Sequence, residues 1–96
     1  MTGSLSRLFF QEARVSPRLQ ILELLSLTVK SLVVAPEHAS VEFENDRGKT
    51  VYRIEVHRDD RLQLLGKAGG NLAALRHLVD AIATKADLSV RLELAD

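Results

Sequence analysis

The chain has 96 residues, and its 13 Lys and Arg balance its 13 Asp and Glu, so the formal net charge is zero. This length suits one domain with a single core. A neutral chain is a poor candidate for strong nonspecific nucleic-acid binding, because neutralisation of phosphates by Lys and Arg supplies most of that affinity. With no cysteine in the sequence, disulfides, thiolate metal sites and cysteine nucleophiles are excluded.

Metal, membrane and export signals are also weak. The three histidines, His38, His57 and His77, lie far apart and lack ligand spacing, so we predict no metal and no cofactor. The most apolar stretch, residues 19–35, contains Gln20, Glu23 and Lys30 and falls short of a membrane span. With no secretory signal visible, we expect a soluble cytoplasmic protein that does not bind membranes.

Two regions are expected, an N-terminal tail over residues 1–15 and one domain over residues 16–96. The tail mixes small, polar and charged residues with a Leu-Phe-Phe cluster and shows no clear period. An alternative is a short amphipathic segment in which Leu5, Leu8 and Phe9 dock on the domain or on a partner.

The domain is predicted to open with a helix. Ser16 can cap its free amides, and Pro17 suits the first helical position. Apolar residues recur downstream at spacings of three and four, and Pro36 requires the helix to end before it. The predicted packing stripe is Leu22, Leu25, Val29, Leu32 and Val33.

Three half-buried strands follow from the alternation of apolar and polar residues. Val41 and Phe43 lead into a turn over residues 45–48, and Tyr52, Ile54 and Val56 complete a hairpin. Residues 88–94 alternate in the same way and predict a third strand. The opposite sheet face carries charges of both signs, which indicate cross-strand pairs on a solvated surface.

Two helices are predicted between the second and third strands. Asp59 or Asp60 can cap a short one. The second begins near Gly70 or Asn71 and runs to about Lys85, with an apolar stripe on one face. The result is an α+β fold in the order α-β-β-α-α-β.

A glycine-rich loop, residues 66–69, joins these two helices. Gly66 can end the first helix in a left-handed conformation, and Gly69 leaves the backbone bare for close approach of another chain. The N–H groups of Gly69, Gly70 and Asn71 are expected to be free and to point out of the loop at the positive end of the next helix, which suits a phosphate. Lys67 can add a charge-assisted contact.

Residues 64–70 (LLGKAGG) followed by 74–79 (ALRHLV) resemble the core signature of the KhpA family of small bacterial single-KH proteins. The similarity extends over about residues 22–96. It implies a type II KH fold with a three-stranded sheet and helices on one face, and a cytoplasmic RNA chaperone or post-transcriptional regulator. A GXXG loop in KH domains clamps the backbone of four nucleotides. The family also implies a homodimer, or a heterodimer with a KhpB/Jag-type KH protein linked to cell-wall synthesis and cell shape.

The predicted single-stranded RNA site comprises the loop and its neighbours. These residues are Leu65, Gly66, Lys67, Ala68, Gly69, Gly70 and Asn71, with Arg61 and Arg76 nearby. Two positions depart from the family pattern, because Gly70 stands where arginine is common and Gln63 where a basic or small residue is frequent. Lys67 is therefore the one positive charge within the loop.

Two other classes of function are alternatives to RNA binding. In the first, the domain is a KH-shaped interaction module that dimerises through helix faces or the Leu-Phe-Phe cluster and binds little RNA. The second is an enzyme, which we do not expect, because Asp59 and Asp60 are adjacent in sequence and are better explained by capping a helix.

Overall fold

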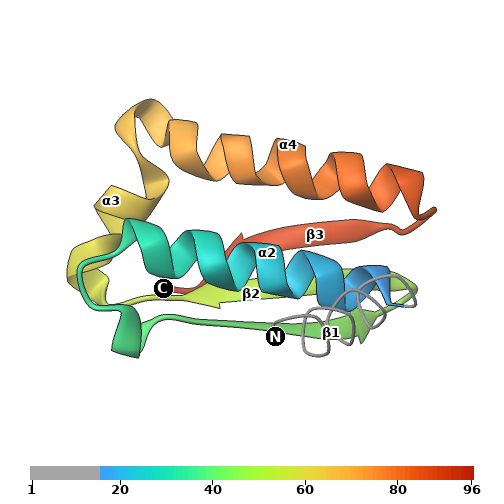
Figure 1. The fold of residues 1–96 in the computed structure, drawn as a ribbon, viewed down its shortest axis with the longest axis horizontal. Helices are drawn as coiled ribbons and strands as arrows, with labels where there is room; N and C mark the ends of the chain where they lie inside the picture. The colour runs from blue at the N-terminus through green and yellow to red at the C-terminus, as the bar shows by residue number, and fades with distance from the viewer. Residues whose placement is uncertain (1–15) are drawn as a thin grey trace, which may run out of the picture.

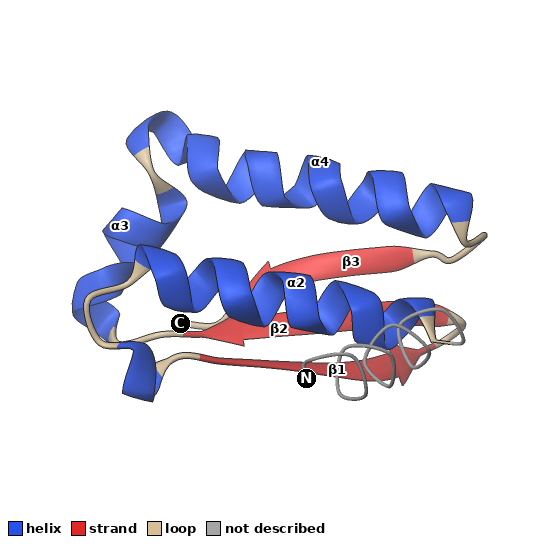
Figure 2. Cartoon of the chain, viewed as in Figure 1, coloured by secondary structure: helices blue, strands red, loops and turns tan. Residues whose placement is uncertain are grey.

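A mixed three-stranded sheet organises residues 16–96, the part of the chain that the computed structural model describes (Figure 1). The strands β1 (Ser40–Asp46), β2 (Lys49–Glu55) and β3 (Val90–Leu94) lie in the order β1-β2-β3. The helices are α2 (Pro17–Leu32), α3 (Arg61–Leu65) and α4 (Gly70–Lys85) (Figure 2). The predicted α+β class and element order are confirmed. Three short 3-10 turns, η1 (Pro36–His38), η2 (Arg58–Asp60) and η3 (Lys67–Gly69), were not predicted.

The strands pair in two different ways. β1 and β2 are antiparallel, whereas β2 and β3 are parallel. The hairpin turn is tighter than predicted, because the strands continue to Asp46 and Lys49 and leave only Arg47 and Gly48 between them. Both turn residues have positive φ, 56° and 81°, as a right-twisted two-residue hairpin requires. A parallel pair needs a crossover connection, and α3 and α4 supply it.

Helix α2 begins as the sequence predicts. The Oγ of Ser16 accepts a hydrogen bond from the N–H of Leu19 at 3.3 Å. Three residues of the predicted stripe, Leu25, Val29 and Val33, are buried as expected, whereas Leu22 and Leu32 are only half-buried. Ile21 is fully buried in addition, because apolar residues cover more than one face of this helix and periodicity alone did not place it in the stripe.

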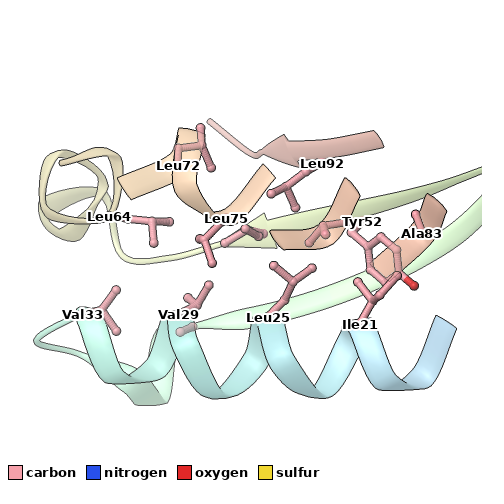
Figure 3. Packing of buried hydrophobic residues seen from close by; sticks show 13 residues of the cluster. Ile21, Leu25, Val29, Val33, Tyr52, Leu64, Leu72, Leu75, Ala83 and Leu92 are labelled. Carbon is pink, nitrogen blue, oxygen red and sulfur yellow. The ribbon is translucent and has the colours of Figure 1, made fainter. Parts of the chain in front are cut away.

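The core lies between the helices and one face of the sheet (Figure 3). Tyr52 and Leu92 point from the strands toward α2 and α4, which contribute the aliphatic side chains facing them, and Ile54 belongs to the same buried cluster. The opposite face carries the predicted charge pairs. Arg91 and Arg53 both contact Glu93, at 3.1 and 3.4 Å. Within residues 16–96, every helix is too short or too polar to cross a bilayer.

Asp60 ties the end of α2 to the start of α3. Its two carboxylate oxygens accept hydrogen bonds from the N–H groups of Val34 and Ala35, each at 3.1 Å. The prediction that an aspartate caps the short helix is therefore wrong for the side chain of Asp60, which makes no such bond in the described structure. Capping of the preceding 3-10 turn is done by His57, whose Nδ1 accepts from the N–H of Asp59 at 3.1 Å.

Replacing Asp60 with alanine should destabilise the domain strongly. Asp60 is only 4% exposed, and its loss leaves two backbone donors without their acceptor. Since a hydrogen bond to a charged group contributes about 1.5–3 kcal/mol, we expect a loss of about 3 kcal/mol in the free energy of unfolding. Asp59→Ala, at the exposed neighbouring position, is the matched control and should change it by less than about 0.5 kcal/mol. Urea unfolding of both variants measures the difference. Equal decreases in the free energy of unfolding would contradict a stabilising role for the two hydrogen bonds of Asp60.

A second polar contact fixes the start of α2 on the hairpin. The hydroxyl of Tyr52 donates to the carbonyl of Arg18 at 2.7 Å, and the Nε of Arg18 donates to the Oγ1 of Thr50 at 2.9 Å. Tyr52 is fully buried. Burial raises the pKa of Tyr52 to about 12, and the nearby guanidinium of Arg18 opposes only part of that increase.

The domain should therefore lose stability in alkali through Tyr52. An unfolded tyrosine titrates near 10, so between pH 10 and about 12 the folded state keeps a proton that the unfolded state has lost. The stabilisation is complete below pH 10 and falls as the pH rises toward 12. Because Tyr52 is the one tyrosine of the chain, tyrosinate absorbance reports it directly. Tyr52→Phe should lack this component of the alkaline loss, and ordinary titration near pH 10 in the folded protein would contradict the account.

Candidate nucleic-acid interface

The loop between α3 and α4 has a backbone that glycine makes possible. Gly66 ends α3, donating its N–H to the carbonyl of Leu62 at 3.0 Å, with φ 76° and ψ 174°. That region is essentially restricted to glycine. Gly69 follows in the left-handed helical region, with φ 74° and ψ 15°. Ala68 is left-handed too, with φ 55°, although it carries a Cβ. Three residues of positive φ thus turn the chain out of one helix and into the next.

The loop satisfies more of its own amides than the sequence analysis predicted. The N–H of Gly69 donates to the carbonyl of Gly66 at 3.0 Å, and the N–H of Gly70 donates to the carbonyl of Lys67. The prediction that these two groups are free is wrong, because the 3-10 turn η3 engages both. A phosphate bound here would therefore be attracted more by the positive end of α4 and by Lys67.

The two glycines face different surroundings. A Cβ on Gly66 would lie 2.6 Å from the Cγ of Asn71, whereas a Cβ on Gly69 or Gly70 would meet none of the described atoms within 4 Å. Asn71 therefore occupies the space beside Gly66. Gly70 has ordinary helical angles, φ −64° and ψ −36°, so a larger side chain would fit there.

Alanine at the two glycines should have unequal effects. Gly69→Ala pays only for a left-handed alanine, about 1 kcal/mol. Gly66→Ala adds a clash with Asn71 to a glycine-only conformation, and we expect the free energy of unfolding to fall by about 3 kcal/mol. Thermal or urea unfolding distinguishes them. Equal effects of the two substitutions would mean that the described loop geometry is wrong.

The remaining predicted site residues lie around the loop in different states of burial. Lys67 and Ala68 are exposed at its tip, and Leu65 is half-buried against the core. Arg61 begins α3, and its Nε is buried without a hydrogen-bond partner within residues 16–96. Ion pairs in this part of the chain involve Arg53, Arg91 and His57, so Lys67, Arg61 and Arg76 stay unpaired there.

A groove of about 570 Å³ runs between α4 and the edge strand β3. Arg76, Val79 and Asp80 line it from α4, and residues 90–95 line it from the strand. Arg76 is the sixth residue after Gly70 along α4, a rise of about 9 Å, so the groove starts close to the loop. Arg76 is the predicted site residue that lines it.

The strand side of this groove was not predicted from the sequence. The alternation over residues 88–94 predicted a strand with one core-facing and one solvated face, and it indicated no binding role. The available signal was topological, because the last strand of a βααβ unit pairs parallel with β2 and leaves its other edge beside α4. The groove has both charge signs, with Arg76 on one wall and Asp80 and Glu93 also present.

The element order, the mixed sheet with β2 and β3 parallel, and the GXXG loop between α3 and α4 define a type II KH domain. Residues 23–94 match the family described as "KhpA/KhpB, KH domain". The chain belongs to this family, which confirms the resemblance seen in the loop and α4. The family is not a known class of enzymes.

Several curated bacterial proteins named "RNA-binding protein KhpA" are similar to the chain. The protein from Listeria monocytogenes is 34% identical over 74 residues, covering 77% of this chain and 97% of that relative. The protein from Halalkalibacterium halodurans is 39% identical over 67 residues, covering 69% and 87%. The protein from Chlamydia trachomatis is 28% identical over 74 residues, covering 77% and 95%. No solved structure matches the chain.

Proposed function

We propose that the chain binds single-stranded RNA through the Gly66–Gly69 loop and the groove beside it. The observation that carries the proposal is the exposed Lys67 at the tip of a left-handed loop, directly before the N-terminus of the 16-residue helix α4. The ammonium group and the positive helix end attract the same phosphate. The names of the relatives support RNA as the ligand.

The groove suits bases that have left the stack. The half-buried Val90 and Leu94 of β3 offer apolar surface, while Arg76 and Asp80 offer a donor and an acceptor. Single-stranded RNA exposes both faces and edges of its bases to such groups, whereas the deep major groove of an RNA duplex does not. The proposed binding set is the loop with Leu65, Gly70, Asn71, Arg61 and Arg76. Contacts from the β3 edge are added to it here.

Affinity is proposed to be modest for the isolated chain. The net charge is zero, Gly70 replaces a common arginine, and the two arginines on the sheet side of the groove are paired with Glu93. A second KH domain would double the binding surface. We therefore propose action as a homodimer or with a KhpB/Jag-type partner, in the cytoplasm, as an RNA chaperone or post-transcriptional regulator that affects cell wall and cell shape. The family description includes KhpB.

The double substitution Lys67→Asp/Ala68→Asp tests RNA binding. It keeps both glycines, and aspartate tolerates the left-handed angles of Ala68 better than most residues do. We expect at least a ten-fold loss of affinity for single-stranded RNA and a smaller salt dependence, because one phosphate contact is removed and repulsion is added. Binding of the purified chain at two salt concentrations, and crosslinking in cells, measure these effects.

The matched control is Thr84→Asp/Lys85→Asp at the far end of α4. It makes the same change in net charge at two exposed positions that lie away from the loop. Retained binding by the control and loss by the loop variant support the proposal. Equal losses would indicate a general charge effect, and unchanged binding by the loop variant would refute it.

A protein-interaction module is the second candidate, and exposed aliphatic side chains favour it. Leu27, Val34 and Leu62 are 70%, 87% and 81% exposed on α2, the following loop and α3. A purified chain that dimerises tightly but shows no salt-dependent RNA binding would favour this function over the first.

A further inference from the structure

One polar contact crosses the loop without using a loop residue. Asn71 is the second residue of α4, and its Nδ2 donates to the carbonyl of Gln63 at 3.1 Å. Gln63 lies in the last turn of the five-residue helix α3, where backbone carbonyls lack partners within the helix. The amide of Asn71 therefore joins the end of one helix to the start of the next.

The same side chain packs on Gly66. A Cβ at Gly66 would fall 2.6, 2.7 and 2.9 Å from the Cγ, Nδ2 and Cβ of Asn71, all closer than real side chains approach. Gly66 thus leaves room for Asn71, and Asn71 covers the glycine. The side chain of Asn71 and the turn from Gln63 to Gly66 form a closed unit, which we name the asparagine clasp.

We propose that Asn71 is a positioning residue for the RNA-binding loop. The asparagine clasp fixes how α3 and α4 approach each other and holds Gly66–Gly69 in one conformation, so that Lys67 is presented to RNA in a set place. The side chain of Asn71 acts through the loop and does not touch RNA, so the contribution of Asn71 to the proposed binding set is its backbone N–H. The effect on RNA rests on the proposed function, whereas the effect on the loop does not.

Fixing the loop in one conformation has a high entropic cost, because several of its residues have much backbone freedom to lose. Gly66 and Gly69 have more backbone freedom to lose than any other residue type, and Ala68 sits in a sparsely populated region. If the loop is already ordered in the free protein, RNA binding does not have to include the entropic cost of ordering it. Removing one net hydrogen bond from the clasp should weaken RNA binding about five-fold.

Asn71→Ala in the full chain is the test, and Gln20→Ala is the matched control. Gln20 is an exposed amide in the first turn of α2, so its removal changes no contact near the loop. The first measurement is hydrogen exchange of the Gly66, Gly69 and Gly70 amides, which donate within the turn. We expect at least five-fold faster exchange in Asn71→Ala, with β2 amides unchanged and no change in Gln20→Ala.

The second measurement is RNA affinity in the wild-type and Lys67→Ala backgrounds. If Asn71 acts by placing Lys67, Asn71→Ala should weaken binding about five-fold in the wild type and less than two-fold when Lys67 is absent. Full multiplication of the two losses would show a separate RNA contact and overturn the positioning role. Unchanged loop exchange would overturn the asparagine clasp itself. If the wild-type chain binds no RNA, the proposed function fails, and the exchange result alone decides whether the clasp orders the loop.

Discussion

Reversal of the chain at Gly66 is the constraint on which the arrangement of the later elements depends. β2 and β3 are parallel, so the chain must cross back over the sheet between them. α3 uses only five residues before Gly66 stops it, and α4 then covers the sheet beside α2 (Figure 1). A backbone with φ 76° and ψ 174° makes this possible, and residues with a side chain rarely adopt it. The position of α4, and the groove between α4 and β3, follow from that turn.

Buried residues and hydrogen bonds hold the segments on both sides of the loop. Leu64, two residues before Gly66, is fully buried in the core, and Asp60 holds the start of the same segment to the end of α2 through two hydrogen bonds. On the other side, Leu72 and Leu75 anchor the first turns of α4. Exposed Lys67 is therefore carried by a short segment whose two ends are fixed, which is how binding loops commonly combine exposure with precise placement.

Much of the fold could be predicted from local patterns. Ser16-Pro17 located the start of α2, alternation located the strands, and the glycine loop located the boundary between α3 and α4. Contacts between distant residues were not predictable in this way. Asp60 resembled a helix cap in sequence, yet its carboxylate binds amides 25 and 26 residues away. The third strand begins at Val90, later than predicted, because Leu88 donates to the carbonyl of Ala83 and closes α4.

The candidate site shows the same division. The sequence located the loop by its glycines, but it could not show that the N–H groups of Gly69 and Gly70 are already engaged, since that depends on the left-handed angles of the loop. It also gave no reason to separate Asn71 from its neighbours. β3 lines the groove because it is the edge strand of the sheet. The alternation of apolar and polar residues predicts a strand but does not predict its position in the sheet. The predicted tail, including the alternative that Leu5, Leu8 and Phe9 dock, lies outside the described residues.

The most direct test of the central claim is a titration of the isotopically labelled chain with short single-stranded RNA, followed by NMR. RNA binding through the loop and groove predicts that amide shifts are concentrated in Gly66–Gly70, around Arg76 and along β3, and that they diminish as salt is added. Shifts confined to the exposed face of the sheet or to α2, or no shifts at all, would contradict that claim.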